Sequence, residues 1–206
     1  MPAQLPTRIW LPPSPLILAS KSTIRSTLLT NCQIPHDVRP ADIDEREIES
    51  HANTTDNVAL VLAKAKALAV SGANKGRYVL GADQTCSLDG IVIHKAPDIA
   101  TLTLQLRQMR GRTHVLTSSA ALVLDSRIIG TCSSVARMTM RNFTDDFLEN
   151  YLSLGGVELL QSVGGYQVEG LGITLMSGIS GDFHTVMGLP LLELLTLFRK
   201  SDLLQQ

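Results

Sequence analysis

The amino-acid sequence predicts an α/β fold in which helices flank a mixed β-sheet. Short apolar runs alternate with helical segments in the N-terminal part of the chain, an order typical of parallel strands joined by crossover helices. The pairs Asp89-Gly90 and Asp125-Ser126 each separate two strand-like runs, as expected of antiparallel neighbours. The 206 residues are enough to bury a hydrophobic core without disulfides, and we find no internal repeat or interdomain linker.

The first predicted unit is a strand, a polar turn and a helix. Residues 15–19 are mostly apolar and predict a short buried strand, and Ser22 is a suitable N-cap for a helix over residues 23–31. Residues 36–40 predict a second strand. We expect the acidic residues 42–49 to form a loop.

A long helix and the central strand follow. Apolar residues recur with near-helical spacing over residues 58–70, between the capping-type pair Thr55-Asp56 and a stop at Gly72. Residues 77–82 predict the central strand of the sheet.

The remaining elements extend the sheet with antiparallel strands and add three helices. The predicted segments are a helix over 98–109, strands over 113–124 and 127–141, a helix from the cap Thr144 through Tyr151, strand and loop over the Gly-rich residues 164–188, and a closing helix over 191–198.

Charge and composition limit the function classes. The formal net charge is −1 and no Lys/Arg block occurs, so the sequence predicts neither a nucleic-acid partner nor binding to an anionic membrane. No apolar run approaches the roughly 20 residues that a membrane-spanning helix needs. The three cysteines, Cys32, Cys86 and Cys132, are far apart and indicate a reducing compartment.

We expect the first 14 residues to be a disordered lead-in. They are rich in proline and lack the continuous apolar stretch and cleavage site of a secretion signal. We therefore expect a cytoplasmic protein with a single domain over residues 15–206.

The turn Ser20-Lys21-Ser22 is a candidate phosphate site. A strand-to-helix turn directs main-chain N–H groups and the positive end of the helix dipole toward an anion, and this turn adds hydroxyls and a cation. Arg25, one turn into the helix, could reach the same anion. The alternative is that Ser22 only caps the helix and that Lys21 and Arg25 are solvated.

Two acidic residues are candidates for metal binding or general-base chemistry. Asp83 and Gln84 follow a largely apolar run, where a buried strand is expected to leave its sheet and where an unpaired carboxylate would be costly. Glu45 lies in the acidic segment. Divalent cations on nucleotide phosphates need few protein carboxylates. The alternatives are a structural ion pair for Asp83 and an exposed charge for Glu45.

Three other charged residues complete the candidate set. Lys66 on the long helix and Lys95 after the hairpin could neutralise phosphate charge, although most helix lysines are solvated. Glu169 and Gly170 follow a strand expected over residues 166–168, where the carboxylate could bond a base edge. An exposed Glu at a β-bulge is the alternative.

The sequence lacks the motifs of several other kinds of active site. The histidines lack the H-x-x-x-H and H-E-x-x-H spacings of zinc sites, and the chain has no G-x-S-x-G elbow of a serine hydrolase. No G-x-G-x-x-G follows the first strand, which argues against a coenzyme-binding oxidoreductase.

Six segments, in this order, resemble the motifs of the Maf family of nucleoside triphosphate pyrophosphatases. The resemblance covers nearly the whole chain, from Leu16 to Phe198. The segments are Leu-Ala-Ser-Lys-Ser-Thr-Ile-Arg (18–25), Asp-Ile-Asp-Glu (42–45), Gly-Ala-Asp-Gln (81–84), Gly-Arg-Thr-His (111–114), Tyr-Gln-Val-Glu-Gly-Leu-Gly (166–172) and Val-Met-Gly-Leu-Pro (186–190).

The resemblance implies cleavage of a nucleoside triphosphate between its α- and β-phosphates, with a divalent cation such as Mg²⁺ or Mn²⁺. It also implies an elongated mixed sheet with two lobes around a central cleft, and a homodimer. By the match, Asp83 would activate water and Glu45 would be an acidic partner near the metal. The implied phosphate-binding set is Ser20, Arg25, Lys66 and Lys95.

Base choice in the family tracks three positions, which are Ile24, Gln84 and Glu169 in this chain. Gln84 and Glu169 resemble the branch that acts on 7-methyl-GTP, and a carboxylate could accept the two N–H groups of guanine and offset the charge of the methylated base. Ile24 matches neither the arginine of the dTTP and UTP branch nor the tryptophan of the methylguanine branch. The specificity therefore stays open between these two classes of modified or noncanonical nucleotide.

A nucleotide sensor or regulator of cell division that binds without turnover is the alternative function, since the family has a historical association with septum formation. The carboxylates and lysines argue against it because a sensor needs no metal-activated water.

Overall fold

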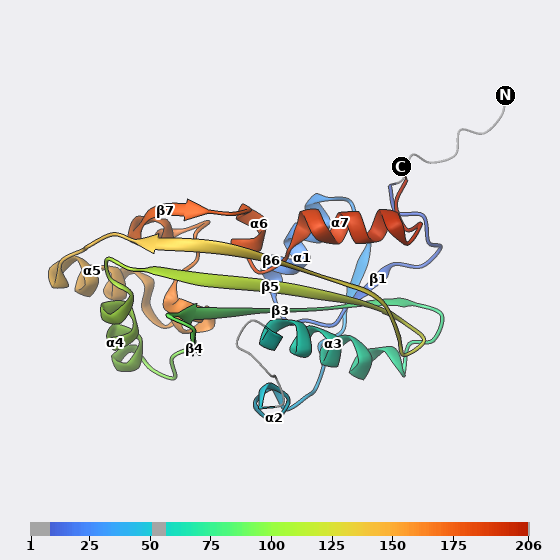
Figure 1. The fold of residues 1–206 in the computed structure, drawn as a ribbon, viewed down its shortest axis with the longest axis horizontal. Coiled ribbons are helices and arrows are strands. Elements are labelled where there is room, and N and C mark those ends of the chain that lie inside the picture. Colours follow the sequence, from blue (N-terminus) through green and yellow to red (C-terminus); the bar gives the residue numbers. More distant parts are fainter. Residues whose placement is uncertain (1–8, 51–56, 206) are drawn as a thin grey trace.

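The strands form one mixed sheet in the order β2-β1-β3-β5-β6-β7, with β4 paired to part of β3 (Figure 1). The computed structural model describes residues 9–50 and 57–205. β1 (Leu16–Leu18) runs parallel to β2 (His36–Val38) and to β3 (Tyr78–Leu88). The antiparallel members are β4 (Ile91–Ile93), β5 (Thr113–Leu124), β6 (Arg127–Met140) and β7 (Met176–Ser180). The predicted mixed sheet is confirmed.

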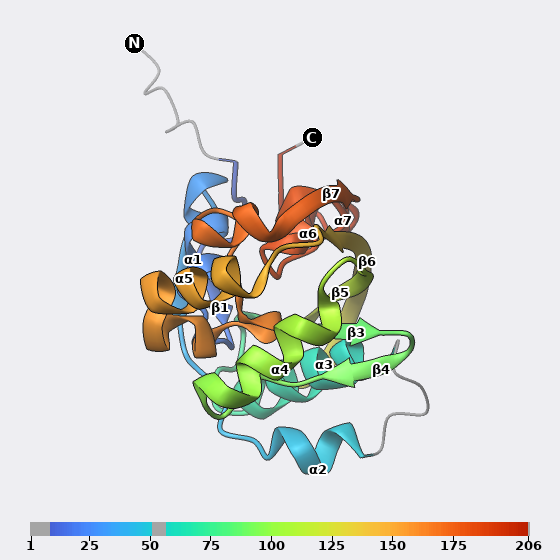
Figure 2. The same ribbon diagram turned by 90° about the vertical axis from the view of Figure 1, so that its left-hand side faces the viewer.

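Helices cover both faces of this sheet. α1 (Thr23–Asn31) and α7 (Leu191–Lys200) lie on one face and α3 (Val58–Ser71) lies on the other (Figures 1 and 2). The short α2 (Glu45–Glu49) contacts α3 on the side away from the sheet (Figure 2). The remaining helices are α4 (Ile99–Met109) and α5 (Asp145–Gly155), at the other end of the long strands, and α6 (Phe183–Val186), which precedes α7.

The pleat of β3 assigns its residues to the two faces. Leu80 and Ala82 pack in the cluster that contains α1 and α7, whereas Val79 packs against alanines of α3. Successive strand residues point to opposite faces, so Asp83 belongs to the α3 face and Gln84 to the α1 and α7 face. A third cluster fills the end of the sheet near α4 and α5.

Local signals in the sequence account for most element boundaries. The Ser22 side chain caps α1 by accepting from the Arg25 N–H, and Asp98 and Thr144 cap α4 and α5 in the same way. Both tight turns use left-handed backbone, at Asp89-Gly90 (φ 50° and 81°) and at Asp125-Ser126 (φ 48° and 62°). The expected cap Thr55-Asp56 lies outside the described residues.

Three expectations were wrong. The acidic segment is not all loop, because Asp44 accepts from the N–H groups of Arg46 and Glu47 and so starts α2. The central strand does not end at Ala82 but continues to Leu88, since β5 pairs with it throughout. Residues 166–168 form no strand; the Gly-rich sequence folds there into tight turns between 3₁₀ helices.

The expected N-terminal lead-in is described only over residues 9–14, and these residues pack against the C-terminal segment. Trp10 is 3% exposed and meets Phe198 edge-on, with a β-bridge between Trp10 and Leu204. Burial of the indole gives this segment an apolar anchor that its proline content concealed. Among the described helices, none has the length and apolarity needed to cross a bilayer.

Candidate functional site

The central strand β3 has an open stretch along one edge. On that edge β1 pairs with Val79 and Leu80, and β4 pairs with residues 86–88, so residues 81–85 have no strand partner there. The other edge is covered by β5. Main-chain groups alternate between the two edges of a strand, and Leu80 O accepts from the N–H of Ala19, the residue after β1. The main-chain groups of Ala82 and Gln84 therefore face the open stretch.

A glycine in β3 lets α3 approach the open stretch closely. A Cβ built on Gly81 would lie 2.0 Å from Ala63 O and 2.7 Å from Ala67 N, both in α3. Only a residue without a side chain fits this contact. Lys66 is carried on the same helix between these two alanines, and the close packing brings its side chain to Asp83.

Lys66 joins the two predicted carboxylates. Its Nζ donates to Asp83 Oδ1 at 2.5 Å and lies 2.8 Å from Glu45 Oε1. The Lys66 and Asp83 side chains are only 10% and 11% exposed, whereas that of Glu45 is 55% exposed. A buried charge needs such a partner because desolvation is costly. The fold thus brings three of the predicted residues, Glu45, Lys66 and Asp83, into contact.

Arg25 fills part of the open edge. Its Nη1 donates to Ala82 O at 2.8 Å and to Ser20 Oγ at 3.0 Å, and its Nε donates to Gly188 O at 2.8 Å. Burial lowers the pKa of the guanidinium, while the Asp83 and Glu45 carboxylates raise it. The group stays cationic at neutral pH. Its Nη2 makes no hydrogen bond within the described residues and is free to meet an anion.

Gln84 makes its contacts on the opposite face from Asp83. Its Nε2 donates to Thr185 O at 2.8 Å, Val186 O at 3.1 Å and Ser118 Oγ at 3.0 Å. The Ser118 hydroxyl also donates to Thr185 O. The amide of Gln84 therefore holds the C-terminal end of α6 against the sheet.

Other predicted residues are not brought into this network. Lys95 is exposed and forms no ion pair with any described residue. Ile24 is half-buried on α1, and Glu169 is exposed in the turn that follows Tyr166. Their expected roles stay predictions.

Ser118, Thr185 and Gly188 were not named as site residues from the sequence. Gly188 was visible only within the segment 186–190, and its φ of 96° sets the turn whose carbonyl Arg25 binds. The adjacent Ser118 and Ser119, which are fully buried and precede the apolar end of β5, were the available signal for the other side of the network.

The donor set suits a hard divalent cation only in part. Glu45 and Asp83 supply carboxylate oxygens that meet at one ammonium nitrogen, and Mg²⁺ or Mn²⁺ on a nucleotide takes few protein ligands. Within residues 9–50 and 57–205, no group of three His, Cys, Asp or Glu side chains could hold a metal. Further ligands would have to come from phosphate oxygens and water.

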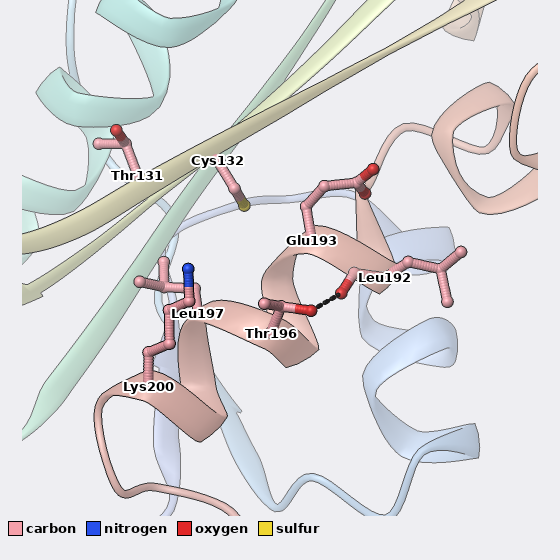
Figure 3. Close-up of a pocket in the computed structure, with 7 residues that line it drawn as sticks. All are labelled: Thr131, Cys132, Leu192, Glu193, Thr196, Leu197 and Lys200. Carbon is pink, nitrogen blue, oxygen red and sulfur yellow. Dashed lines mark hydrogen bonds between the residues drawn. The ribbon is translucent and has the colours of Figure 1, made fainter.

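A separate cavity of about 360 Å³ lies between β6 and α7 (Figure 3). Thr131 and Cys132 come from β6, and the Glu193 and Lys200 side chains come from α7. None of the predicted site residues lines it. The predicted residues that the fold brings together therefore lie at the open edge of β3 and not in this cavity.

Known proteins resemble this chain over most of its length. Residues 15–201 match the family described as Maf-like protein. The chain belongs to the Maf family. This Maf family member is 48% identical over 198 residues to a nucleoside triphosphate pyrophosphatase of Rhodopseudomonas palustris (strain BisB18), covering 95% of this chain and 98% of that protein.

A second relative of this Maf family member is a 7-methyl-GTP pyrophosphatase of Brucella suis biovar 1 (strain 1330). It is 44% identical over 190 residues, covering 90% of this chain and 96% of that protein. A solved HAM1 protein from Coxiella burnetii is 16% identical with a TM-score of 0.45, covering 62% of this chain and 73% of the other.

Proposed function

We propose that this Maf family protein is a hydrolase that splits nucleoside triphosphates into a nucleoside monophosphate and pyrophosphate. Water attacks the α-phosphorus, the bond from that phosphorus to the oxygen bridging the α- and β-phosphates breaks, and pyrophosphate leaves. The proposed substrates are modified or noncanonical nucleotides. The relatives named as pyrophosphatases match almost the whole chain, which supports this activity. The observation that carries the proposal is the pairing of Asp83 and Glu45 with Lys66 beside the open edge of β3.

Each residue at the edge is suited to one part of the reaction. The Asp83 carboxylate is the proton acceptor for the attacking water, since it is the buried acid of the site. Lys66 and the free Nη2 of Arg25 bind phosphate oxygens, and the Ser20 hydroxyl orients Arg25. Lys95 extends this set when substrate is bound.

A divalent cation is part of the proposal. Glu45 and Asp83 would hold it together with phosphate oxygens, which fits their hard oxygen donors. Such a cation neutralises charge on the phosphates and polarises the phosphoryl group. Glu45 is the accessible member of the pair, so it can exchange Lys66 for the cation with little rearrangement.

The base is selected at the other face of β3. We propose Ile24, Gln84 and Glu169 as the specificity positions, with guanine or 7-methylguanine favoured by the Glu169 carboxylate. A pyrimidine offers no pair of N–H donors to that carboxylate. Homodimer formation is proposed from family resemblance.

The test is an assay of purified protein with Mg²⁺ and 7-methyl-GTP, GTP, dTTP, UTP or ITP, following pyrophosphate release. Asp83→Asn is expected to lower kcat by at least about 100-fold, in line with loss of a general base. Asp37→Asn, which removes an exposed carboxylate that pairs with Arg77, is the matched control and should keep full activity. An active Asp83→Asn enzyme would refute the mechanism, and binding without turnover by the wild type would favour the sensor.

A further inference from the structure

His114 and Tyr166 form a buried pair that the proposed chemistry does not use. His114 is fully buried at the start of β5 and Tyr166 is 5% exposed. His114 Nε2 and the Tyr166 hydroxyl are 2.5 Å apart, and the rings meet edge-on with centroids 5.5 Å apart. Two residues distant in sequence are thereby fixed to each other in the core.

This pair leaves a buried polar group without a hydrogen-bond partner in the part of the chain that the structure describes. His114 Nδ1 is buried and has no hydrogen-bond partner among the described residues. If the tyrosine donates to Nε2, the Nδ1–H has no acceptor; if Nε2–H donates, the tyrosine proton has none. An unsatisfied buried donor is destabilising, so an apolar pair of similar shape would stabilise the core more. The fold alone does not explain this pair.

Tyr166 begins the turn that presents Glu169. Gln167 O accepts from Gly170 N at 3.2 Å and from Gly172 N at 3.1 Å. A Cβ on Gly172 would lie 2.5 Å from Gln167 O and 2.7 Å from the Tyr166 Cβ, so the turn closes tightly on its first two residues. The position of Tyr166 therefore sets the position of Glu169.

His114 lies on the same face of the sheet as Gln84. Ser118, which bonds Gln84, is four residues along β5 from His114, and residues separated by an even number share one face of a strand. The spacing corresponds to roughly 13 Å along the strand. His114 can thus fix the Glu169 turn at a set distance from the Gln84 side of the site.

We propose that His114 and Tyr166 are positioning residues for base selection, which hold the Glu169 turn beside the bound base without touching it. This inference rests on the proposed pyrophosphatase function. Burial lowers the pKa of His114 to about 4 and raises that of Tyr166 well above its ordinary value. Both groups therefore stay neutral at physiological pH.

The experiment compares Tyr166→Phe and wild type on triphosphates that differ only in the base, with inorganic tripolyphosphate as a substrate without a base. Tyr78→Phe is the matched control. It removes the hydroxyl of a tyrosine at the first residue of β3, whereas His114 lies near the last residues of that strand. We expect Tyr166→Phe to raise KM for the preferred nucleotide about tenfold, the scale of a small misplacement, with little change in kcat or with tripolyphosphate. Because Tyr166→Phe leaves His114 Nε2 without its partner, its melting temperature should fall, and the base dependence of KM is the readout that separates positioning from packing.

His114→Gln and His114→Leu provide the second arm. A glutamine amide can occupy the place of Nε2 and keep a hydrogen bond to Tyr166, so it should restore base discrimination that His114→Leu loses. Unchanged discrimination in Tyr166→Phe and His114→Leu would overturn the proposal. Equal losses on every substrate with a lower melting temperature would assign the pair a structural role and also overturn it. A wild type without turnover on any nucleotide would instead refute the proposed function.

Discussion

Asp83 and Gln84 are neighbours in β3, yet their side chains serve opposite faces of the sheet. Asp83 bonds Lys66 of α3, whereas Gln84 bonds the carbonyls of Thr185 and Val186. Both faces are reached from the same open edge. The proposed binding of phosphates near Lys66 and of the base near Gln84 would therefore use both faces of the sheet.

The role of the Gln84 amide can be tested by changing its donor into an acceptor. Gln84→Glu sets a carboxylate oxygen against the Thr185 and Val186 carbonyls, so we expect it to lower the free energy of unfolding by about 2–3 kcal/mol. Urea unfolding measures this loss. Gln108→Glu, on the exposed side of α4, is the control and should stay within about 0.5 kcal/mol of wild type. Equal stability of the two variants would contradict the anchoring role.

Arg25 should not tolerate lysine. Its guanidinium bonds Ser20, Ala82 and Gly188 at once, and a single ammonium group cannot reproduce that fork. Arg25→Lys is expected to cost about 2 kcal/mol of stability and to raise KM for the triphosphate. Thermal unfolding and steady-state kinetics check the two effects. Arg199→Lys, at the exposed end of α7, should leave both unchanged, and a neutral Arg25→Lys would disprove this assignment.

Gly81 should be intolerant of alanine for steric reasons. The added methyl group would collide with the backbone of α3 and push Lys66 away from Asp83, at a cost of about 3 kcal/mol. Gly178→Ala in β7 is the control, because its Cβ would meet nothing closer than 3.8 Å. Unfolding curves and activity of the two variants give the comparison. Similar unfolding curves for Gly81→Ala and Gly178→Ala would show that α3 can shift to accommodate the added methyl group.

Stability should depend on pH through His114. The unfolded chain has a histidine pKa of about 6.5, and burial lowers the pKa to about 4 in the folded protein. As the pH falls, the unfolded chain therefore binds the proton first, and the stabilisation of the folded state is lost between these two values. The expected loss approaches roughly 3 kcal/mol at pH 4. Urea unfolding at pH 7, 6 and 5 should show a steeper decline in wild type than in His114→Gln; parallel declines would contradict this origin.

Local signals predicted much of the fold. Caps such as Ser22 and Thr144 and the turn at Asp125-Ser126 lie close to their own elements, so residue chemistry alone identifies them. The extension of β3 past Asp83 was missed because it depends on pairing with β5, which is distant in sequence.

The residues of the candidate site were likewise predicted only in part. Residue type and family motifs identified Glu45, Lys66 and Asp83, which the fold brings together. The partners of Gln84 could not be predicted, since Thr185 and Val186 contribute main-chain oxygens that carry no sequence signature. The relation of Glu169 to the base depends on a bound nucleotide.

The pairing of Trp10 with Leu204 also bears on the kinetics of folding. It joins opposite ends of the chain, and contacts that close such long loops carry a large entropy cost and are expected to form late. Interactions absent from the transition state affect the unfolding rate far more than the folding rate. We therefore expect Trp10→Ala to speed unfolding while refolding keeps its wild-type rate, so that this small terminal contact determines how long each folded molecule persists.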